Sequence, residues 1–157
     1  MLNNMEAEIF NNDIKIISQN IKIIQYFTNL GEELVFDYEN LEIDHDYHVL
    51  TSKINNRDHV IILEFKFIEK ASTNKQINKS NLLNIVVEGK YLVNDDVAEE
   101  KISSAKHFGS LNLLLNYLRT VIYNITSMTL NGGHYLPLVN IASLHEKNKM
   151  KKKKKKE

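Results

Sequence analysis

The sequence predicts an α+β fold: a four-stranded antiparallel sheet packed by a long C-terminal helix and followed by a short last helix. Two patterns predict it. Apolar and polar residues alternate through the middle of the chain, and apolar residues recur every three or four positions in its last third. A length of 157 residues suits one domain of ordinary size.

The N-terminal segment fits two structures. Isoleucines from Ile14 to Ile24 recur at spacings of 3, 4 and 3, as on a helix face. Residues 20–27 are rich in β-branched and aromatic side chains, which favour a strand. We expect a short helix before about Ser18 and a strand from about Gln19 to Phe27.

Three further strands show alternation more clearly. In the first of them, Ile43, Tyr47 and Val49 fall on one face and acidic residues on the other. One buried face and one acidic face are typical of an antiparallel meander. The expected strands are residues 41–49, 59–69 and 81–93, with a turn at 55–58 and a loop at 71–80.

A helix follows, with its apolar seam at Phe108, Leu111, Leu115, Leu118, Ile122 and Ile125. Ser103, Ser104 or Ser110 is expected to cap its start, and Gly132-Gly133 its end. Apolar residues beside the seam widen the stripe beyond what one sheet needs, which indicates burial in an oligomer; they are Leu114, Tyr117, Val121 and Met128. Residues 135–141 should be extended, and 142–147 a last helical turn.

The net charge of zero conceals an acidic body and a basic tail. Residues 147–157 hold eight lysines and one glutamate, which leaves residues 1–146 with a charge of −7. We therefore expect one domain over 1–146 and a disordered lysine-rich tail over 147–157. No apolar run approaches the roughly 20 residues of a membrane span, and the N-terminus lacks a secretory pattern, so we expect a cytoplasmic protein without integral membrane association.

The residues give no pattern typical of an enzyme. Cysteine is absent, and Gly132-Gly133 follows a helix instead of leading a phosphate-binding loop. Between Glu42 and His48 the acids resemble a metal site, but His45 and His48 should point to opposite faces of the strand. A solvated acidic face is the favoured interpretation. We expect no cofactor, no metal and no catalytic site.

The segment from Leu114 to Thr126 carries Tyr117-x-Arg119 and then Tyr123-Asn124-Ile125-Thr126, and a Leu-Pro step follows within residues 135–140. It resembles the long helix and exit segment of the SecB family of export chaperones. The Tyr-Asn-Ile-Thr spacing is closest to SecB-like chaperones associated with toxin–antitoxin operons. This chain has Asn116 where the family commonly has proline, and residues 131–134 lengthen the turn.

The resemblance implies a homotetramer, a dimer of dimers, that holds unfolded preproteins export-competent without ATP. A dedicated chaperone of an antitoxin is the alternative within this fold. Client binding is expected from Tyr47, Phe65, Phe67, Tyr91 and Leu138. Structural or oligomer contacts are expected from Tyr117, Arg119, Leu111, Leu115, Leu118 and Ile122.

The family's SecA motor binds acidic residues on the outer sheet face. Glu88 is the best match to one of them, whereas the first strand offers only Asn20 or, in another register, Asp13. A different class of function is polyanion or nucleic-acid binding by Lys147–Lys156. Because that tail lacks interleaved aromatic residues for stacking on bases, we expect no specific nucleic-acid partner.

Overall fold

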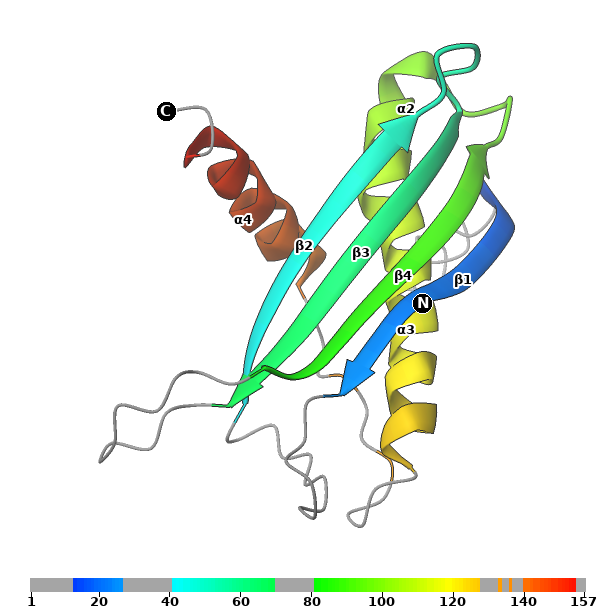
Figure 1. Cartoon of the computed structure of the whole chain (residues 1–157). Helices are drawn as coiled ribbons and strands as arrows, with labels where there is room; N and C mark the ends of the chain where they lie inside the picture. The colour runs from blue at the N-terminus through cyan, green and yellow to red at the C-terminus, as the bar shows by residue number, and fades with distance from the viewer. Residues whose placement is uncertain are drawn as a thin grey trace, which may run out of the picture.

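Four antiparallel strands and a C-terminal group of helices make up the described part of the chain in the computed structural model (Figure 1). The structure describes residues 13–26, 41–69, 81–127, 133, 136 and 140–154. The strands are β1 (Ile14–Tyr26), β2 (Leu41–Thr51), β3 (Asp58–Glu69) and β4 (Asn81–Val93). The helices are α2 (Glu99–Ser104), the π-helical η2 (Ala105–Ser110), α3 (Leu111–Thr126) and α4 (Ile141–Lys154).

The strand order in the sheet is β1-β4-β3-β2, so β1 and β2 form its two edges. All three pairings are antiparallel, as predicted, but the expected meander of four strands is wrong, because β1 pairs with β4 and not with β2. One face is covered by the helices: α3 runs behind the sheet in Figure 1, and α4 lies beside β2. The other face is more exposed to solvent, which explains why β2, β3 and β4 alternate in burial.

Strand β1 begins at Ile14, so the expectation of a helix before Ser18 is wrong. Two β-bulges explain the misleading period, one between Ile16 and Ser18 and one between Ile21 and Ile23. Each bulge inserts one residue and reverses the facing of the residues after it. Three isoleucines of uneven spacing thereby reach the same face, since Ile14, Ile21 and Ile24 pair with Val93, Val87 and Ile85.

The helical run begins earlier than the apolar seam, at Glu99, because a turn at residues 94–97 is held in place by one arginine. Arg57 donates to the carbonyl oxygens of Asn94 (2.6 Å) and Val97 (2.9 Å), and also to Glu99 (3.0 Å). Two acids in the first turn of α2 suit the helix dipole. The predicted serine caps are wrong: Ser103, Ser104 and Ser110 lie inside the helical run.

The core lies between α3 and the sheet. The middle of the predicted seam and two of its flanking residues are buried there: Leu111, Leu114, Leu115, Leu118, Val121 and Ile122. Phe108, at the start of the seam, is 36% exposed, and Ile125, at its end, is half-buried. Each buried apolar side chain of α3 stabilises the packing of the helix on the sheet by about 1.5–3 kcal/mol. The inference that the flank is reserved for an oligomer is therefore wrong for Leu114 and Val121, which are buried within the chain. Met128 lies outside the described residues.

Helix α4 extends from Ile141 to Lys154, well beyond the single turn predicted at residues 142–147. The expectation of a disordered tail is thus corrected over residues 147–154. Lysine and methionine are good helix formers, lysines at the C-terminal end suit the dipole, and Leu144 and Asn148 anchor the helix in the structure. The division of the chain at residue 146 stays a prediction. None of the helices described is both long and apolar enough to cross a bilayer.

Candidate functional site

Strand β1 carries the main exposed apolar surface of the sheet. Five of its isoleucines are between 38% and 55% exposed: Ile16, Ile17, Ile21, Ile23 and Ile24, hereafter the isoleucine strip. Pairing with Tyr91, Val87 and Ile85 places Ile16, Ile21 and Ile24 on the helix-facing side, whereas Ile23 pairs with Val86 on the outer side. The strip therefore covers both faces of one strand.

The same strand has a free edge, since β4 is its only partner among the described strands. An edge of this length presents unpaired backbone N–H and C=O groups, which template the addition of another strand. Proteins usually protect such edges with charge, and β1 has only Lys15 and Lys22 among 13 residues. An apolar, weakly protected edge is suited to pairing with a second polypeptide.

One side chain ties β1 to the helices. Gln19 Nε2 donates to the Tyr91 hydroxyl (3.0 Å) and to the carbonyl of Leu113 (3.3 Å). Burial raises the pKa of Tyr91 to about 12, so the hydroxyl stays neutral. Gly89 makes room for this ring, because a Cβ there would overlap it. The inner side of β1 is thus fixed near Gln19 while the isoleucines around it remain exposed.

Four of the residues predicted to bind clients are buried in the structure. Tyr47, Phe65, Phe67 and Tyr91 are at most 1% exposed and belong to the core, so in this conformation they meet no external chain. The apolar face that alternation identifies is the face on which the helices lie. Leu138, the fifth predicted contact, lies outside the described residues.

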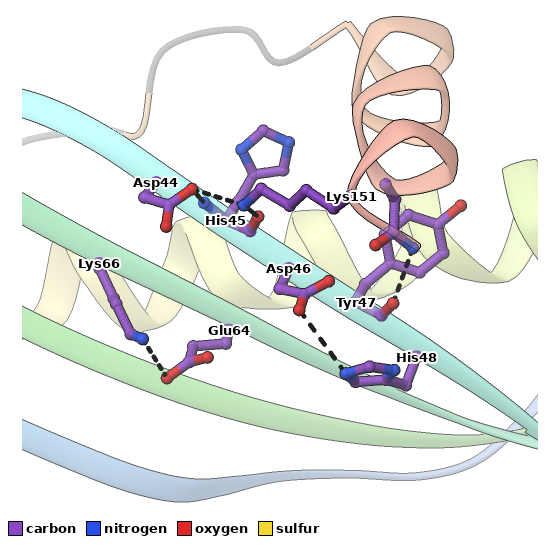
Figure 2. Close-up of polar contacts among 9 residues, drawn as sticks. Asp44, His45, Asp46, Tyr47, His48, Glu64, Lys66 and Lys151 are labelled. Atoms are coloured by element: carbon purple, nitrogen blue, oxygen red, sulfur yellow. Dashed lines mark hydrogen bonds and ion pairs between the residues drawn. The ribbon is translucent and has the colours of Figure 1, made fainter. Parts of the chain in front are cut away.

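Helix α4 covers the inner side of β2 through a mainly polar contact. The Tyr47 hydroxyl is hydrogen-bonded to His145 Nδ1, and Asn148 Nδ2 donates to the Tyr47 carbonyl (2.8 Å). Figure 2 shows Lys151 reaching from α4 to Asp44 (2.7 Å); its ammonium also donates to the His45 carbonyl (2.9 Å). Together with buried Leu144, these contacts hold α4 in place.

Aromatic rings cluster beneath α4. The rings of His107 on η2 and His145 on α4 lie 5.0 Å apart, with Tyr47 at 6.4 and 6.3 Å from them and Phe108 at 5.4 Å from His145. Burial lowers the pKa of both histidines, and nearby lysines lower it further. His45 lies on the same side of β2, where burial followed by Lys151 and Lys147 lowers its pKa.

The acids of β2 are engaged in simple ion pairs, as the solvated-face interpretation expects. Asp44 pairs with Lys151; burial raises its pKa, but the hydrogen bond and charge of Lys151 outweigh this and leave it lowered. Asp46 pairs with exposed His48 (3.7 Å), drawn in Figure 2. His45 is half-buried and its ring packs, tilted, against that of Phe65 on the inner side, so the two histidines do point to opposite faces. Within the described ranges, no three potential metal ligands gather.

Glu88, the predicted partner contact, lies on the outer face of β4. It pairs across the strands with Asn20, the position that the first strand offers for a second acid. Lys22 forms an ion pair with Glu88 (3.2 Å), and the glutamate side chain is only 17% exposed. The local surface therefore carries a compensated charge.

The predicted structural residues of α3 divide into two groups. Leu111, Leu115, Leu118 and Ile122 are fully buried between helix and sheet. Tyr117 and Arg119 are half-buried, and Arg119 donates to Asn116 on its own helix (2.7 Å). Among the described residues, Arg119 thus braces the helix and makes no hydrogen bond to the sheet.

Two functional features were not predicted from the sequence: the isoleucine strip and the docking of α4. A run of β-branched residues with few charges is the signal for the first. Because two bulges give the strand a helix-like spacing of isoleucines, part of it was expected to be helical and the strip was not predicted. The second depends on contacts between residues about 100 positions apart, for which a single sequence carries no signal.

No protein-family model and no curated protein matches the sequence, so likeness is found in structure. The SecB-like chaperone Rv1957 of Mycobacterium tuberculosis, solved in complex with a ChAD peptide from the Rv1956 HigA1 antitoxin, superposes with a TM-score of 0.53 at 12% identity, over 83% of this chain and 93% of that one. A Streptococcus agalactiae protein of unknown function has a TM-score of 0.45 at 10% identity, over 80% and 97% of the chains, too low to add to the comparison. The chain has the α+β fold of a SecB-like chaperone.

Proposed function

We propose that the protein is an ATP-independent holdase chaperone that binds non-native polypeptides and delays their folding. The observation that carries the proposal is the isoleucine strip, displayed on a SecB-like fold. Monomeric proteins seldom expose a continuous apolar surface unless it serves an interaction. The proposed activity is binding of polypeptides, without catalysis.

The strip supports assembly from identical subunits. Two β1 edges can pair antiparallel around a two-fold axis, so that the same residues meet from both sides. Pairing would bury isoleucines on both faces of the sheet and satisfy the free backbone groups of Ile14–Tyr26. We propose this dimer as the unit from which a dimer of dimers, the homotetramer, is built.

Two kinds of client are compatible with the fold, and one comparison favours the narrower kind. The structurally similar Rv1957 is solved with a peptide from an antitoxin. We therefore propose an antitoxin as the second candidate client beside unfolded preproteins awaiting export. Either chain is met where proteins are synthesised, so the proposal places the holdase in the cytoplasm. An adjacent toxin–antitoxin gene pair would favour the narrower client.

Engagement of a SecA motor has weaker support. Glu88 is paired with Lys22 and lies opposite neutral Asn20, so a basic partner must displace an ion pair to reach one carboxylate. Polyanion binding through the lysines of α4 belongs to another class of function. It predicts salt-sensitive DNA or RNA binding that disappears when residues 147–157 are deleted; binding unchanged by the deletion would remove it.

Refolding of a chemically unfolded client tests the holdase. We expect the wild-type chain at about one tetramer per client to slow refolding and suppress aggregation, because a bound unfolded chain is withdrawn from folding. An Ile21→Ser/Ile24→Ser variant should lose this effect, because it removes the proposed β1 pairing and with it the assembly that holds the client. Ile54→Ser is the matched control, since Ile54 is 99% exposed in the β2–β3 loop, away from the strip. A wild-type chain that leaves refolding and aggregation untouched contradicts the proposal.

A further inference from the structure

We propose that α4 is a latch over the inner side of β2, and that protonation of His107 and His145 opens it. The purpose of the latch, control of a client surface, rests on the proposed holdase function. The latch itself is a property of the folded chain and can be measured without any client.

Helix α4 is attached weakly compared with α3. Leu144 and Asn148 are the two buried side chains of α4, whereas α3 buries six large apolar residues. The other contacts of α4 are the partly buried Ile141, the ring contacts of His145, and polar contacts. The polar contacts are hydrogen bonds and the exposed Lys151–Asp44 ion pair, which contribute about 1 kcal/mol each or less.

The two histidines lie in a positively charged contact. Their rings, 5.0 Å apart, face one another across the contact between η2 and α4. The cations near them are Lys106 of η2, which donates to Thr51 at 3.3 Å, and Lys149 and Lys152 of α4. Glu146 is the acid near His145, and Tyr47 on β2 is neutral. A proton on either ring therefore adds to an excess of positive charge.

A third histidine at this contact, His45, also has a lowered pKa. His45 on β2 lies near Lys147 and Lys151 of α4, and near Asp44 and Asp46 on its own strand. Asp44 is already paired with Lys151. His45 Nε2 and His107 Nδ1 are buried without a hydrogen-bond partner among the described atoms, so neither ring is stabilised there in its charged form.

The direction of the pH effect follows from linkage. Docking lowers the pKa of His107 and His145, so the undocked state binds more protons below the ordinary value of about 6.5. Docking is therefore complete above about pH 6.5 and weakens as the pH falls through the lowered pKa values. Two histidines weaken it by at most about 100-fold per pH unit.

Opening the latch exposes aromatic surface. Tyr47 loses the covering His145 and Asn148, and His45, which stacks on Phe65 at 5.7 Å, loses Lys151. Phe108, already 36% exposed, adjoins the same surface. Tyr47 and Phe65 are among the residues predicted to bind clients, and an open latch is the state in which a client would reach the first of them.

The experiment measures the position of α4 directly. Because the chain has no cysteine, Met150→Cys on α4 (64% exposed) and Ile54→Cys on the β2–β3 loop accept spin labels cleanly. Labelled chain is diluted with unlabelled chain so that only distances within one subunit are read. At about pH 7.5 we expect one narrow distance distribution, and at about pH 5.5 a broad one, with far-UV circular dichroism showing that the sheet persists.

Variants identify the responsible rings. His107→Gln/His145→Asn should keep the narrow distribution at about pH 5.5, while the control His48→Gln, on the outer face, should open like wild type. An unchanged wild-type distance at that pH overturns the proposal, and so does equal opening in the double variant. If the double variant does not fold, ring resonances of the wild-type chain decide: His107 and His145 must titrate below about pH 6.5.

Client binding separates the latch from the holdase. If α4 opens at the lower pH and no unfolded client binds at either pH, the holdase proposal fails and the latch stands. If client affinity is high but α4 never moves, the latch fails and the holdase stands. Tighter client binding at the lower pH in wild type, lost in His107→Gln/His145→Asn, supports both.

Discussion

The two edges of the sheet differ in how they are protected against pairing with another strand. At β2, acidic side chains line the outer face and α4 covers the inner face. At β1, protection is weaker among the described residues: the isoleucine strip is exposed on both faces, and Lys15 and Lys22 supply the only charges of the strand. Charge and cover are the usual means of preventing edge-to-edge association. This difference between a covered, charged edge and an exposed edge with two lysines supports the proposed pairing of β1 with a partner.

The largest expected effect comes from breaking the bare edge. Ile21→Lys/Ile24→Lys adds two charges where two subunits would meet. In a two-fold symmetric dimer, each substitution is present on both subunits. Each isoleucine lost from an interface costs about 1.5 kcal/mol or more, so we expect an association weaker by about 100-fold or more. Sedimentation velocity should show smaller species with unchanged circular dichroism.

The control for this substitution is Leu50→Lys, at the other edge, where Leu50 is 55% exposed. It adds a positive charge to β2 and should leave the assembly intact. Equal loss of association in both variants would mean that β1 has no special role.

Removing the cover from β2 should have the next largest effect. Leu144 is 1% exposed, and Leu→Ala in a packed site costs about 2–5 kcal/mol, more than the weak docking of α4 can withstand. We expect Leu144→Ala to raise amide exchange in α4 and at the edge of β2 while β3 and β4 remain protected. Met150→Ala, at an exposed position on the same helix, should exchange like wild type; a Leu144→Ala variant that unfolds globally would refute weak docking.

Much of the fold was predicted from the spacing of apolar residues along the sequence alone. The alternation in residues 41–93 predicted three strands and their antiparallel order, because one face of an antiparallel sheet is buried and the other is wet. The heptad-like seam predicted α3, whose seam leucines are all buried. β1 was partly misjudged because two bulges produce helical spacing in a strand, and bulges depend on pairing with β4 that no local pattern reveals.

A smaller effect concerns pH and the centre of the sheet. His59 is buried; its Nδ1 donates to the Arg57 carbonyl (3.0 Å), so its Nε2 accepts from the Ser110 hydroxyl (2.7 Å). Burial lowers its pKa, so its contribution to stability is present above about pH 6.5 and is lost as the pH falls, at no more than about 1.4 kcal/mol per unit. Urea unfolding should show this slope in wild type and a flatter one in His59→Gln.

The pH dependence of urea unfolding also tests whether α4, the cover of β2, moves independently of the sheet. It reports global unfolding, whereas the latch opens while the sheet persists. If the unfolding midpoint and the α4 distance changed together at every pH, β2 would have no separable cover.

The smallest expected effect is at the Lys22–Glu88 ion pair. Exposed pairs contribute about 0–1 kcal/mol, so Lys22→Ala should change stability little. It frees Glu88, however, and a basic partner that uses this carboxylate should bind more tightly, as titration with purified SecA would reveal. Binding that is unaffected by both Lys22→Ala and Glu88→Gln removes Glu88 from the partner surface.

The candidate site was predicted less well than the fold. Tyr47, Phe65, Phe67 and Tyr91 were chosen as apolar strand residues, and the same property places them in the core. Core and groove residues share composition, and only the position of a covering helix distinguishes them. For Tyr47 that cover is α4, whose lysine-rich sequence gave no apolar stripe from which docking could be predicted.

The most direct test of the holdase assembled through β1 is the mass of the particle by light scattering, alone and with a chemically unfolded client. We expect about four times the chain mass of 18.3 kDa, increased by captured client. A monomer whose mass is unchanged by the client would contradict both the role of the bare β1 edge and the holdase function.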